Sequence, residues 1–360
     1  MIIAQNMHNF VLLIRPIMKR FFHFLVVATA LLAMVGCDSL FTSSSAKREA
    51  IGSSYELVVL CDEENWKGAL GEELRSWLQQ PVEMLNQEEP RFNVIHTTPQ
   101  FYKQSYPFHR NILKVVCSPE AKVAAALAEY DKDAAPQIVV TFQGPTIEAM
   151  LEYLKENGDK LCKVFEIAER DRTIAAAEKR GAKELEKMIR TKFGINMHLS
   201  TGYMFRTQSK DFLWASYEFP VASQGFFIYS HPFSGKESIT TDALVKARNK
   251  FAKRIPGPSE GSYMTTVTRI PNIEDDSYMD FKPERRVVRI NDHDWVELRG
   301  FWEVEGDFMG GPFVSYTTLD KATGKLLTLD CYVYSPKNDK RNHLRALEHL
   351  VYGVSFAEKQ

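Results

Sequence analysis

Residues 294–305 read Asp-Trp-Val-Glu-Leu-Arg-Gly-Phe-Trp-Glu-Val-Glu. Val296, Leu298, Trp302 and Val304 alternate with charged or aromatic side chains in this stretch. Successive side chains of a strand point to opposite faces, so the alternation predicts a β-strand with one apolar face.

The same pattern recurs around this strand. Further strands are expected at 285–291, 312–319 and 325–335, joined by short turns that are rich in Asp and Gly. An amphipathic helix is expected from about residue 338 to 352. Four antiparallel strands followed by a helix predict an α+β layer at the end of the chain.

The first half of the chain alternates apolar runs with helical patterns. The expected strands are 57–61, 112–117 and 138–142. Helices are expected after Asn65, from Pro119 through Tyr130, and from Thr146 to a stop at Gly158. This order predicts a mixed sheet with covering helices.

Residues 159–193 form one charged helical pattern, with Gly181 as the expected break. Two interpretations remain open: an arm that protrudes toward a partner, or a strut or hairpin packed on the sheet. Asp171 and Arg172, which interrupt the apolar stripe, favour the second. Strands follow at 196–205, 211–219 and 224–230, and then a helix from Thr241 that Pro256 ends.

The N-terminal region has the layout of a secretory signal. Lys19 and Arg20 precede an apolar run over 21–35, and Gly36 and Cys37 follow. The run is shorter than the roughly 20 residues that a spanning helix needs. Residues 34–37, Met-Val-Gly-Cys, resemble a bacterial lipoprotein signal, in which the cysteine thiol receives a diacylglycerol and cleavage precedes the cysteine. An uncleaved signal anchor with a chance cysteine is the alternative.

These patterns divide the chain into four parts. They are a signal peptide over 1–36, in which 1–17 reflect an upstream start, a polar tether over 37–54, an α/β layer with the long charged helix over 55–195, and an antiparallel sheet with helices over 196–360.

Composition excludes several classes of protein. Lys and Arg number 45 against 46 Asp and Glu, and this balance disfavours a dedicated nucleic-acid binder. Hydrophobic residues make up 44%, which is typical of a globular chain. The cysteines beyond residue 37 have no metal-binding spacing, and sequence alone leaves open whether any of them form a disulfide.

No recognisable catalytic motif is present. The acidic stretch 62–64 follows a strand, where a metal or acid–base site is one interpretation and a charged helix start the other. The stretch 292–294, Asp-His-Asp, is expected at a hairpin turn. The chain has no HExxH and no Gly-x-Ser-x-Gly motif, so no metal and no cofactor are predicted.

The meander is the predicted binding surface. Its polar strand faces are expected to form one acidic surface with aromatic side chains, which suits a glycan or a protein partner; a merely solvated sheet face is the alternative. The candidate residues are Glu297, Glu303, Glu305, Asp307, Met309, Gly310, Gly311, Asp330, Tyr332 and Tyr334.

The loop 306–312, Gly-Asp-Phe-Met-Gly-Gly-Pro, stands out within this region. Gly310 and Gly311 are expected to allow a positive φ and a close backbone approach. Phe308 and Met309 either fill the core or project toward a partner.

Three stretches carry a resemblance to a known family. They are 60–66 with Leu60-Cys61-Asp62 and Trp66, 309–313 with Met-Gly-Gly-Pro-Phe, and 334–341 with Tyr-Ser-Pro-Lys followed by Lys340 and Arg341. They resemble an uncharacterised family of bacterial cell-envelope lipoproteins, a domain of unknown function, over nearly all of 55–352. The resemblance implies a place in the envelope and no particular activity.

Two hypotheses follow. The first is a non-enzymatic protein that binds or scaffolds an envelope component, with Cys37 anchoring it to the outer membrane facing the periplasm, and with exposure at the cell surface left open. The second is a hydrolase of envelope polymers that works through carboxylates such as Asp62, Glu63 or those of the acidic sheet face. Three or more such carboxylates in one closed pocket would favour the hydrolase.

Overall fold

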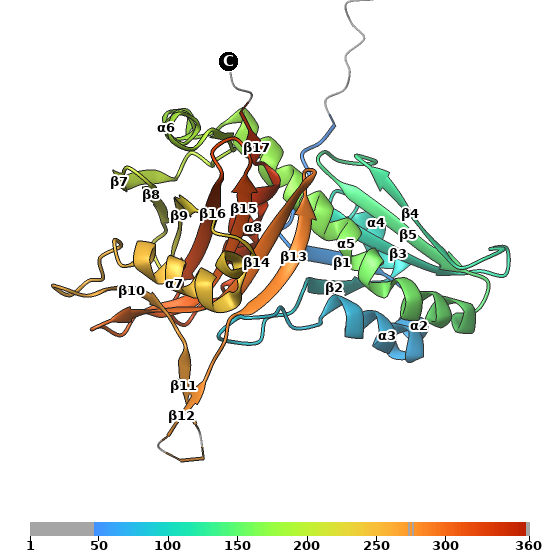
Figure 1. The fold of residues 1–360 in the computed structure, drawn as a ribbon. Coiled ribbons are helices and arrows are strands. Elements are labelled where there is room, and N and C mark those ends of the chain that lie inside the picture. The colour runs from blue at the N-terminus through green and yellow to red at the C-terminus, as the bar shows by residue number, and fades with distance from the viewer. Residues whose placement is uncertain (1–46, 273, 276, 358–360) are drawn as a thin grey trace, which may run out of the picture. The chain divides into compact units, whose positions relative to one another are not determined.

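Apolar strands and amphipathic helices assemble into two β-sheets with helices packed on them (Figure 1). This computed structural model describes residues 47–272, 274, 275 and 277–357. The predicted signal peptide, Cys37 and the tether as far as residue 46 lie outside the described residues. Residues Ala50–Gln360 form one unit, and all contacts below lie within it. The predicted α+β class is confirmed.

The first sheet has five strands in the order β2-β1-β3-β5-β4, of which only β4 is antiparallel to its neighbour. The strands are β1 Glu56–Leu60, β2 Asn93–Thr97, β3 Asn111–Cys117, β4 Ala125–Tyr130 and β5 Ile138–Gly144. Backbone hydrogen bonds already join Ile51 to Phe108 and Arg110, so ordered structure begins inside the segment assigned to the tether.

Four helices accompany this sheet, and two of them, α3 and α5, bury their apolar sides against one face. The helices are α2 Glu63–Lys67, α3 Ala69–Leu78, α4 Pro99–Ser105 and α5 Ile147–Lys179. Tyr102 of α4 packs on the opposite face, against Val58 and Ile112.

The helix expected to stop at Gly158 continues past it to Lys179, and α5 is 33 residues long in all. Gly158 is buried in its middle because the Trp77 ring packs directly on it: a Cβ there would lie 2.4 Å from that ring. The break at Gly181 is confirmed, and α6 spans Lys183–Phe193. Leu154, Phe165 and other apolar residues of α5 lie in the core, so the helix is a packed strut.

The helix predicted through residue 130 is wrong. Ala125–Tyr130 forms the edge strand β4, which pairs with β5 from Gln143 to Ile138. The stretch Ala-Ala-Leu-Ala-Glu-Tyr favours a helix by propensity, but strand pairing outweighs the small difference of a few tenths of a kcal/mol per residue. Leu127 and Tyr130, expected on a buried helix face, are exposed.

The second sheet has eight strands and contains the predicted meander. Seven follow the order β10-β14-β15-β16-β9-β8-β7, and β13 pairs with the first part of β14. The strands are β7 Met204–Ser209, β8 Phe212–Glu218, β9 Ser223–Pro232, β10 Tyr263–Thr266, β13 Glu284–Ile290, β14 His293–Glu305, β15 Gly310–Asp320 and β16 Lys325–Tyr334.

Helices cover both faces of this sheet, as Figure 1 allows the reader to follow. Helix α8, Arg341–Tyr352, packs with α6 on one face, where Leu347 meets Leu329 and Val333 in one core. Helix α7, Thr241–Ala252, packs on the other, where Phe251 stacks on Tyr229 with ring centroids 4.3 Å apart.

Smaller elements complete the unit. Strand β6 pairs with β17, and β11 with β12 in a hairpin that projects in Figure 1. Their bounds are β6 Ile195–Asn196, β11 Arg269–Pro271, β12 Tyr278–Asp280 and β17 Ser355–Phe356, and a 3-10 turn, η1, spans Lys236–Ile239. None of the helices that the structure describes is long and apolar enough to cross a membrane.

Charged side chains inside the covered sheet are paired. On the α7 face, Arg248 and Asp330 are fully buried, with Nε 2.9 Å from Oδ2. On the α8 face, Arg299 bridges Glu297 at 2.7 Å and Glu348 at 2.6 Å. Burial alone would raise the pKa of Glu348, but the charges of Arg299 and Arg345 lower it to about 2. Removing one partner of such a pair typically costs about 3–5 kcal/mol, because it leaves a buried charge alone.

The two sheet layers meet at the N-terminal end of α8. The buried Glu89 carboxylate accepts the backbone N–H groups of Lys340 at 2.7 Å and Arg341 at 2.8 Å, and so caps that helix from the other layer. Nearby, the Tyr55 hydroxyl lies 3.0 Å from Nε2 of His349.

The described cysteines, Cys61, Cys117, Cys162 and Cys331, are free thiols.

We predict that His349 makes the fold sensitive to acid. Burial lowers the pKa of this imidazole to about 3, so the folded state holds it neutral while the unfolded chain takes up a proton near pH 6.5. Stability is therefore lost as the pH falls below about 6.5, at up to about 1.4 kcal/mol per pH unit. Denaturant unfolding of the wild type and of His349→Gln between pH 7.5 and 5 should show a flatter dependence in the variant.

Tyr55→Phe is the matched control, because it removes the hydrogen-bonding hydroxyl and keeps the titrating ring. It should lower stability at every pH and retain the wild-type slope. An unchanged slope in His349→Gln would contradict the assignment.

Candidate functional site

A pocket of about 320 Å³ opens in the eight-stranded layer, beside the end of α7. Its walls are mainly aromatic and apolar, and they come from β8, β9, β14, β16 and the segment after α7. The lining residues are Trp214, Glu218, Ser223, Ile255, Pro256, Gly257, Met264, Trp302, Val304, Met309, Tyr332 and Tyr334. We call this cavity the aromatic pocket.

Hydrogen bonds fix the orientation of its rings. The Trp214 indole N–H donates to the Tyr332 hydroxyl at 2.8 Å, and the buried Trp302 N–H donates to the Val333 carbonyl at 3.1 Å. The rings of Trp302 and Tyr332 meet edge to face, with centroids 5.5 Å apart. Burial raises the pKa of Tyr332, so its phenol stays protonated. The pocket is therefore preorganised.

Two glycines make room for these rings. A Cβ at Gly311 would lie 2.1 Å from the Val333 carbonyl oxygen and 3.2 Å from the Trp302 indole nitrogen. A Cβ at Gly225 would fall 2.4 Å from the Tyr332 ring. Close approach of neighbouring backbone therefore explains why Gly310 and Gly311 are glycines. The positive φ expected at these two positions occurs instead at Gly306, where it is 86°.

Polar groups lie at the rim of the pocket. Glu218 receives hydrogen bonds from Ser216 at 2.7 Å and from Arg206 at 3.1 Å, both through Oε1. Among the described residues, none is hydrogen-bonded to Oε2 of Glu218, the Ser223 hydroxyl or the Tyr334 hydroxyl. The rim can thus hydrogen-bond a ligand whose ring lies against the aromatic walls.

The loop after β14 also borders the pocket. Its Asp307 carboxylate accepts hydrogen bonds from the Ser259 hydroxyl and from the Phe308 backbone N–H. Met309 packs toward the core beneath α7, whereas Phe308 is fully exposed. Met309 therefore fits the core interpretation, and the exposure of Phe308 leaves contact with a partner as a prediction.

The structure brings together only part of the predicted surface. Met309, Tyr332 and Tyr334 line the aromatic pocket. Gly310 and Gly311 begin β15 beside it, while Glu303 and Glu305 lie exposed near the end of β14. Although Glu303 is exposed, neighbouring atoms partly desolvate its carboxyl group, and this together with the Glu305 charge raises its pKa.

Glu297 and Asp330 do not share a surface with each other. Leu298 aligns with Ser315, which aligns with Asp330, so Glu297 points to the opposite face of the sheet. Both carboxylates are buried and paired with arginines. The expectation of one solvated acidic face fails because α7 and α8 cover both faces.

The other acidic motifs do not form a catalytic cluster. Asp62 and Glu63 are exposed at the start of α2 in the five-stranded layer, where Glu63 pairs with Lys67. Asn291 and Asp292 form the predicted hairpin turn, with φ values of 48° and 62°. Within the part of the chain that the structure describes, no three His, Cys, Asp or Glu side chains are placed to hold a metal ion.

Sequence reasoning missed Trp214, Met264 and the segment 255–257 as parts of the site. These residues lie far from the meander in sequence and reach it only through the pairing of β8 with β9 and of β10 with β14. Strand pairing between distant segments leaves no local signal, so only the aromatic character of Trp214 could have suggested a role.

The site thus belongs to an α+β protein with a preorganised aromatic pocket. Residues 182–353 match the family model described as Domain of unknown function (DUF4837), and residues 50–178 match Domain of unknown function (DUF8532). Each half of the folded unit is therefore similar to a family of domains of unknown function. The pocket lies within the first of these ranges.

Solved structures show distant likeness only. A structure of a point mutant of the protein Mog1 is 8% identical, with 46% of this chain and 92% of that chain covered, at a TM-score of 0.28. Human StAR-related lipid transfer protein 5 is 12% identical, with 51% and 95% covered, at a TM-score of 0.22. No curated protein matches the chain.

We predict that Gly311→Ala destabilises the protein. The added methyl group would press on the Val333 carbonyl, which cannot move without disturbing the pairing of β16. Overpacking of this kind typically costs about 1–3 kcal/mol. Denaturant unfolding should show that loss, together with altered tryptophan fluorescence.

Gly353→Ala serves as the control, because its Cβ would meet ordinary contacts of 3.5 Å or more. Equal destabilisation by the two substitutions would refute the close-approach explanation for Gly311.

Proposed function

We propose that this protein is a lipid-anchored, non-enzymatic binding protein of the bacterial cell envelope, and that its aromatic pocket takes up the sugar ring of a glycan. The observation that carries the proposal is the pocket itself, in which hydrogen bonds and ring contacts hold Trp214, Trp302 and Tyr332 in place. Preorganised rings lose little conformational freedom when a ligand binds.

The chemistry of the pocket supports a sugar as ligand. A pyranose ring has an apolar face of C–H groups and an equator of hydroxyls. The half-buried rings of Trp214 and Tyr334 offer flat surfaces on which the apolar face of the sugar can lie. Glu218 and Ser223 at the rim offer hydrogen-bonding groups for the hydroxyls of the sugar.

The same lining favours binding over hydrolysis. Most glycoside hydrolases use a pair of carboxylic residues that flank the scissile bond. Of the described residues that line the aromatic pocket, Glu218 is the single carboxylic residue, and it is held by Arg206. We therefore place the protein among binding proteins and not among hydrolases.

The proposed location rests on the sequence. The apolar run 21–35 followed by Gly36 and Cys37 suits cleavage and lipidation, and several acyl chains on one residue would anchor the protein firmly. We propose the outer membrane, with the folded unit on the periplasmic side.

Cys37→Ser should abolish the anchor. We expect the wild type to carry radiolabelled palmitate and to fractionate with membranes, because the thioether-linked diacylglycerol requires the thiol. The variant should lose the label and keep its leader, whose apolar run can itself hold the chain at a membrane, so the label is the deciding readout. Cys61→Ser, which changes a buried thiol of the folded unit, is the control and should retain the label. Equal labelling of wild type and Cys37→Ser would remove the anchor from the proposal.

The pocket can be tested with a soluble glycan fragment. We expect N,N′-diacetylchitobiose or maltose to bind saturably and to change tryptophan fluorescence. Trp214→Ala should weaken that binding by about tenfold or more, since the loss of a stacked ring corresponds to at least about 1–2 kcal/mol.

Trp66→Ala is the matched control. Trp66 is also half-buried, but it stacks on His96 in the five-stranded layer, so its loss should leave the affinity unchanged. Failure of both sugars to bind the wild type, or an equal loss in the two variants, would overturn the assignment of the pocket.

A further inference from the structure

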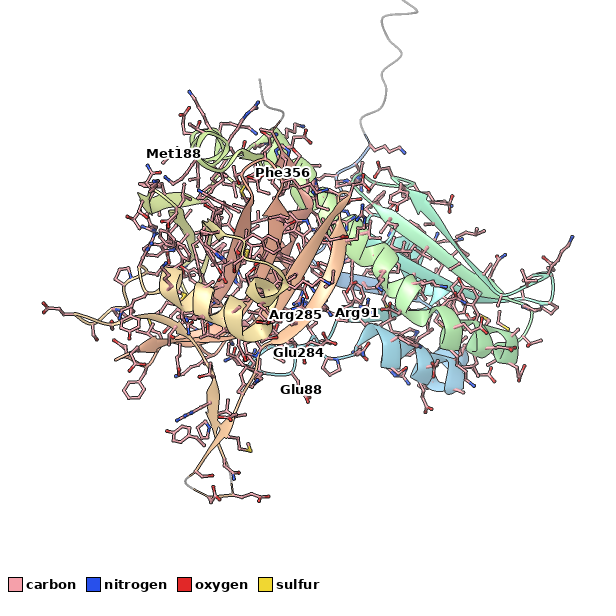
Figure 2. All side chains as sticks on the ribbon, in the orientation of Figure 1. Glu88, Arg91, Met188, Glu284, Arg285 and Phe356 are labelled. Carbon is pink, nitrogen blue, oxygen red and sulfur yellow. The ribbon has the colours of Figure 1, made fainter. Side chains whose placement is uncertain are left out.

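A second cavity, of about 300 Å³, lies where the two sheet layers meet. Four parts of the chain line it: the segment between α3 and β2, helix α5, strands β13 and β14, and helix α8. In Figure 2, Arg91 lies between the β13 strand and the helices of the five-stranded layer. We call this space the junction cavity.

Cationic side chains dominate its wall. Those lining it are Arg91, Lys163, Arg286, Arg299 and Arg345. Glu83, Asp159 and Glu166 also line it. Behind the wall, Glu297 pairs with Arg286 and Arg299, and Glu348 pairs with Arg299 and Arg345, so the five cations face five carboxylates in all.

The acidic groups of the wall are already engaged. Glu166 accepts two hydrogen bonds from Arg91, at 2.8 and 3.0 Å, and one from Arg345 at 3.3 Å. Asp159 accepts from Arg91 at 3.0 Å and pairs with Lys163 at 2.7 Å. These carboxylates therefore have little capacity left to neutralise further donors.

Donors, by contrast, remain available. The Nε of Arg345 is buried and has no hydrogen-bond acceptor among the described residues. Arg286 uses Nε and Nη1, toward Glu297 and Glu83, and no described residue accepts from its Nη2. The side chains of Arg286 and Lys163 are 52% and 60% exposed, so they can reorient toward an incoming anion.

We propose that the junction cavity is a binding site for the phosphate group of a small ligand. Arginine forks and a lysine converging from separate elements recognise phosphate oxygens through charge-assisted hydrogen bonds. This site is separate from the aromatic pocket and does not depend on the function proposed for it.

The experiment uses the full-length protein, purified as cells make it, with inorganic phosphate as the probe. Replacing sodium chloride by sodium phosphate at pH 7.5 and constant ionic strength should raise the melting temperature in a concentration-dependent way, because only the folded state has the site. Isothermal titration calorimetry should give the affinity. An equal effect of the two salts would overturn the proposal.

Arg286→Ala and Lys163→Ala should each weaken phosphate binding by about tenfold, the change expected when one charge-assisted hydrogen bond is lost. Both side chains are largely exposed, so the variants should fold. Arg289→Ala is the matched control: it removes an arginine of the same strand that pairs with Asp294, lies three residues away and is not part of the lining.

Arg289→Ala should keep the wild-type affinity within about twofold. If it weakened binding as much as Arg286→Ala, the effect would be one of general charge, and the site would be refuted.

Glycerol 3-phosphate distinguishes two sources of the phosphate group. Tighter binding than inorganic phosphate supports a phosphate monoester as ligand, and equal binding supports free phosphate. Trp214→Ala should leave both affinities unchanged, which separates this site from the aromatic pocket.

Discussion

The arrangement of the eight-stranded layer depends on the ion pair between Arg248 of α7 and Asp330 of β16. Both side chains are fully buried, and the Arg248 guanidinium also lies 3.8 Å from the centroid of the Phe313 ring and donates to Thr266 at 2.9 Å. Desolvation makes either charge alone unfavourable inside a protein, so a register of helix and strand that separated them would cost about 3–5 kcal/mol. The pair thereby fixes where α7 lies on the sheet.

The aromatic pocket follows from that placement. Helix α7 ends at Ala252, and the chain turns through Ile255 and Pro256 to form one wall. Asp330 is two residues from Tyr332, whose hydroxyl accepts from Trp214. A shift of the helix would therefore move the wall of the pocket, while the floor on β16 stayed in place. The buried charges thus determine the geometry of a site that they do not line.

Local patterns predicted the strands well, and they failed where tertiary contacts decide. The strands at 285–291 and 294–305 match β13 and β14 within two residues, because alternation along a strand is a local property. The alternation of Thr328, Asp330 and Tyr332 with apolar residues predicts a polar strand face that forms part of a binding surface. Nothing in β16 itself indicates that α7, about eighty residues earlier, covers that face.

The same limit explains the errors at Gly158 and at 125–130. Gly158 has the sequence properties of a helix end, and only the Trp77 ring from another helix explains why the helix continues. Residues 125–130 become a strand because β5 presents an open edge. For the candidate site, the meander supplied Met309, Tyr332 and Tyr334, whereas Trp214 and Met264 come from strands that pair with it from a distance.

The charge pairing also bears on the choice between binding and catalysis. A general acid or base needs a carboxyl group that can reach a substrate and exchange a proton. Glu297, Asp330 and Glu348 are buried, and each is held by an arginine, so they are removed from substrate although they are numerous in the meander layer. The aromatic pocket lies at one end of this layer, and the junction cavity lies where it meets the other. Glu218 is the single carboxylic residue in the described lining of the aromatic pocket, and each carboxylate that lines the junction cavity is engaged by an arginine or a lysine, which supports the proposal of binding.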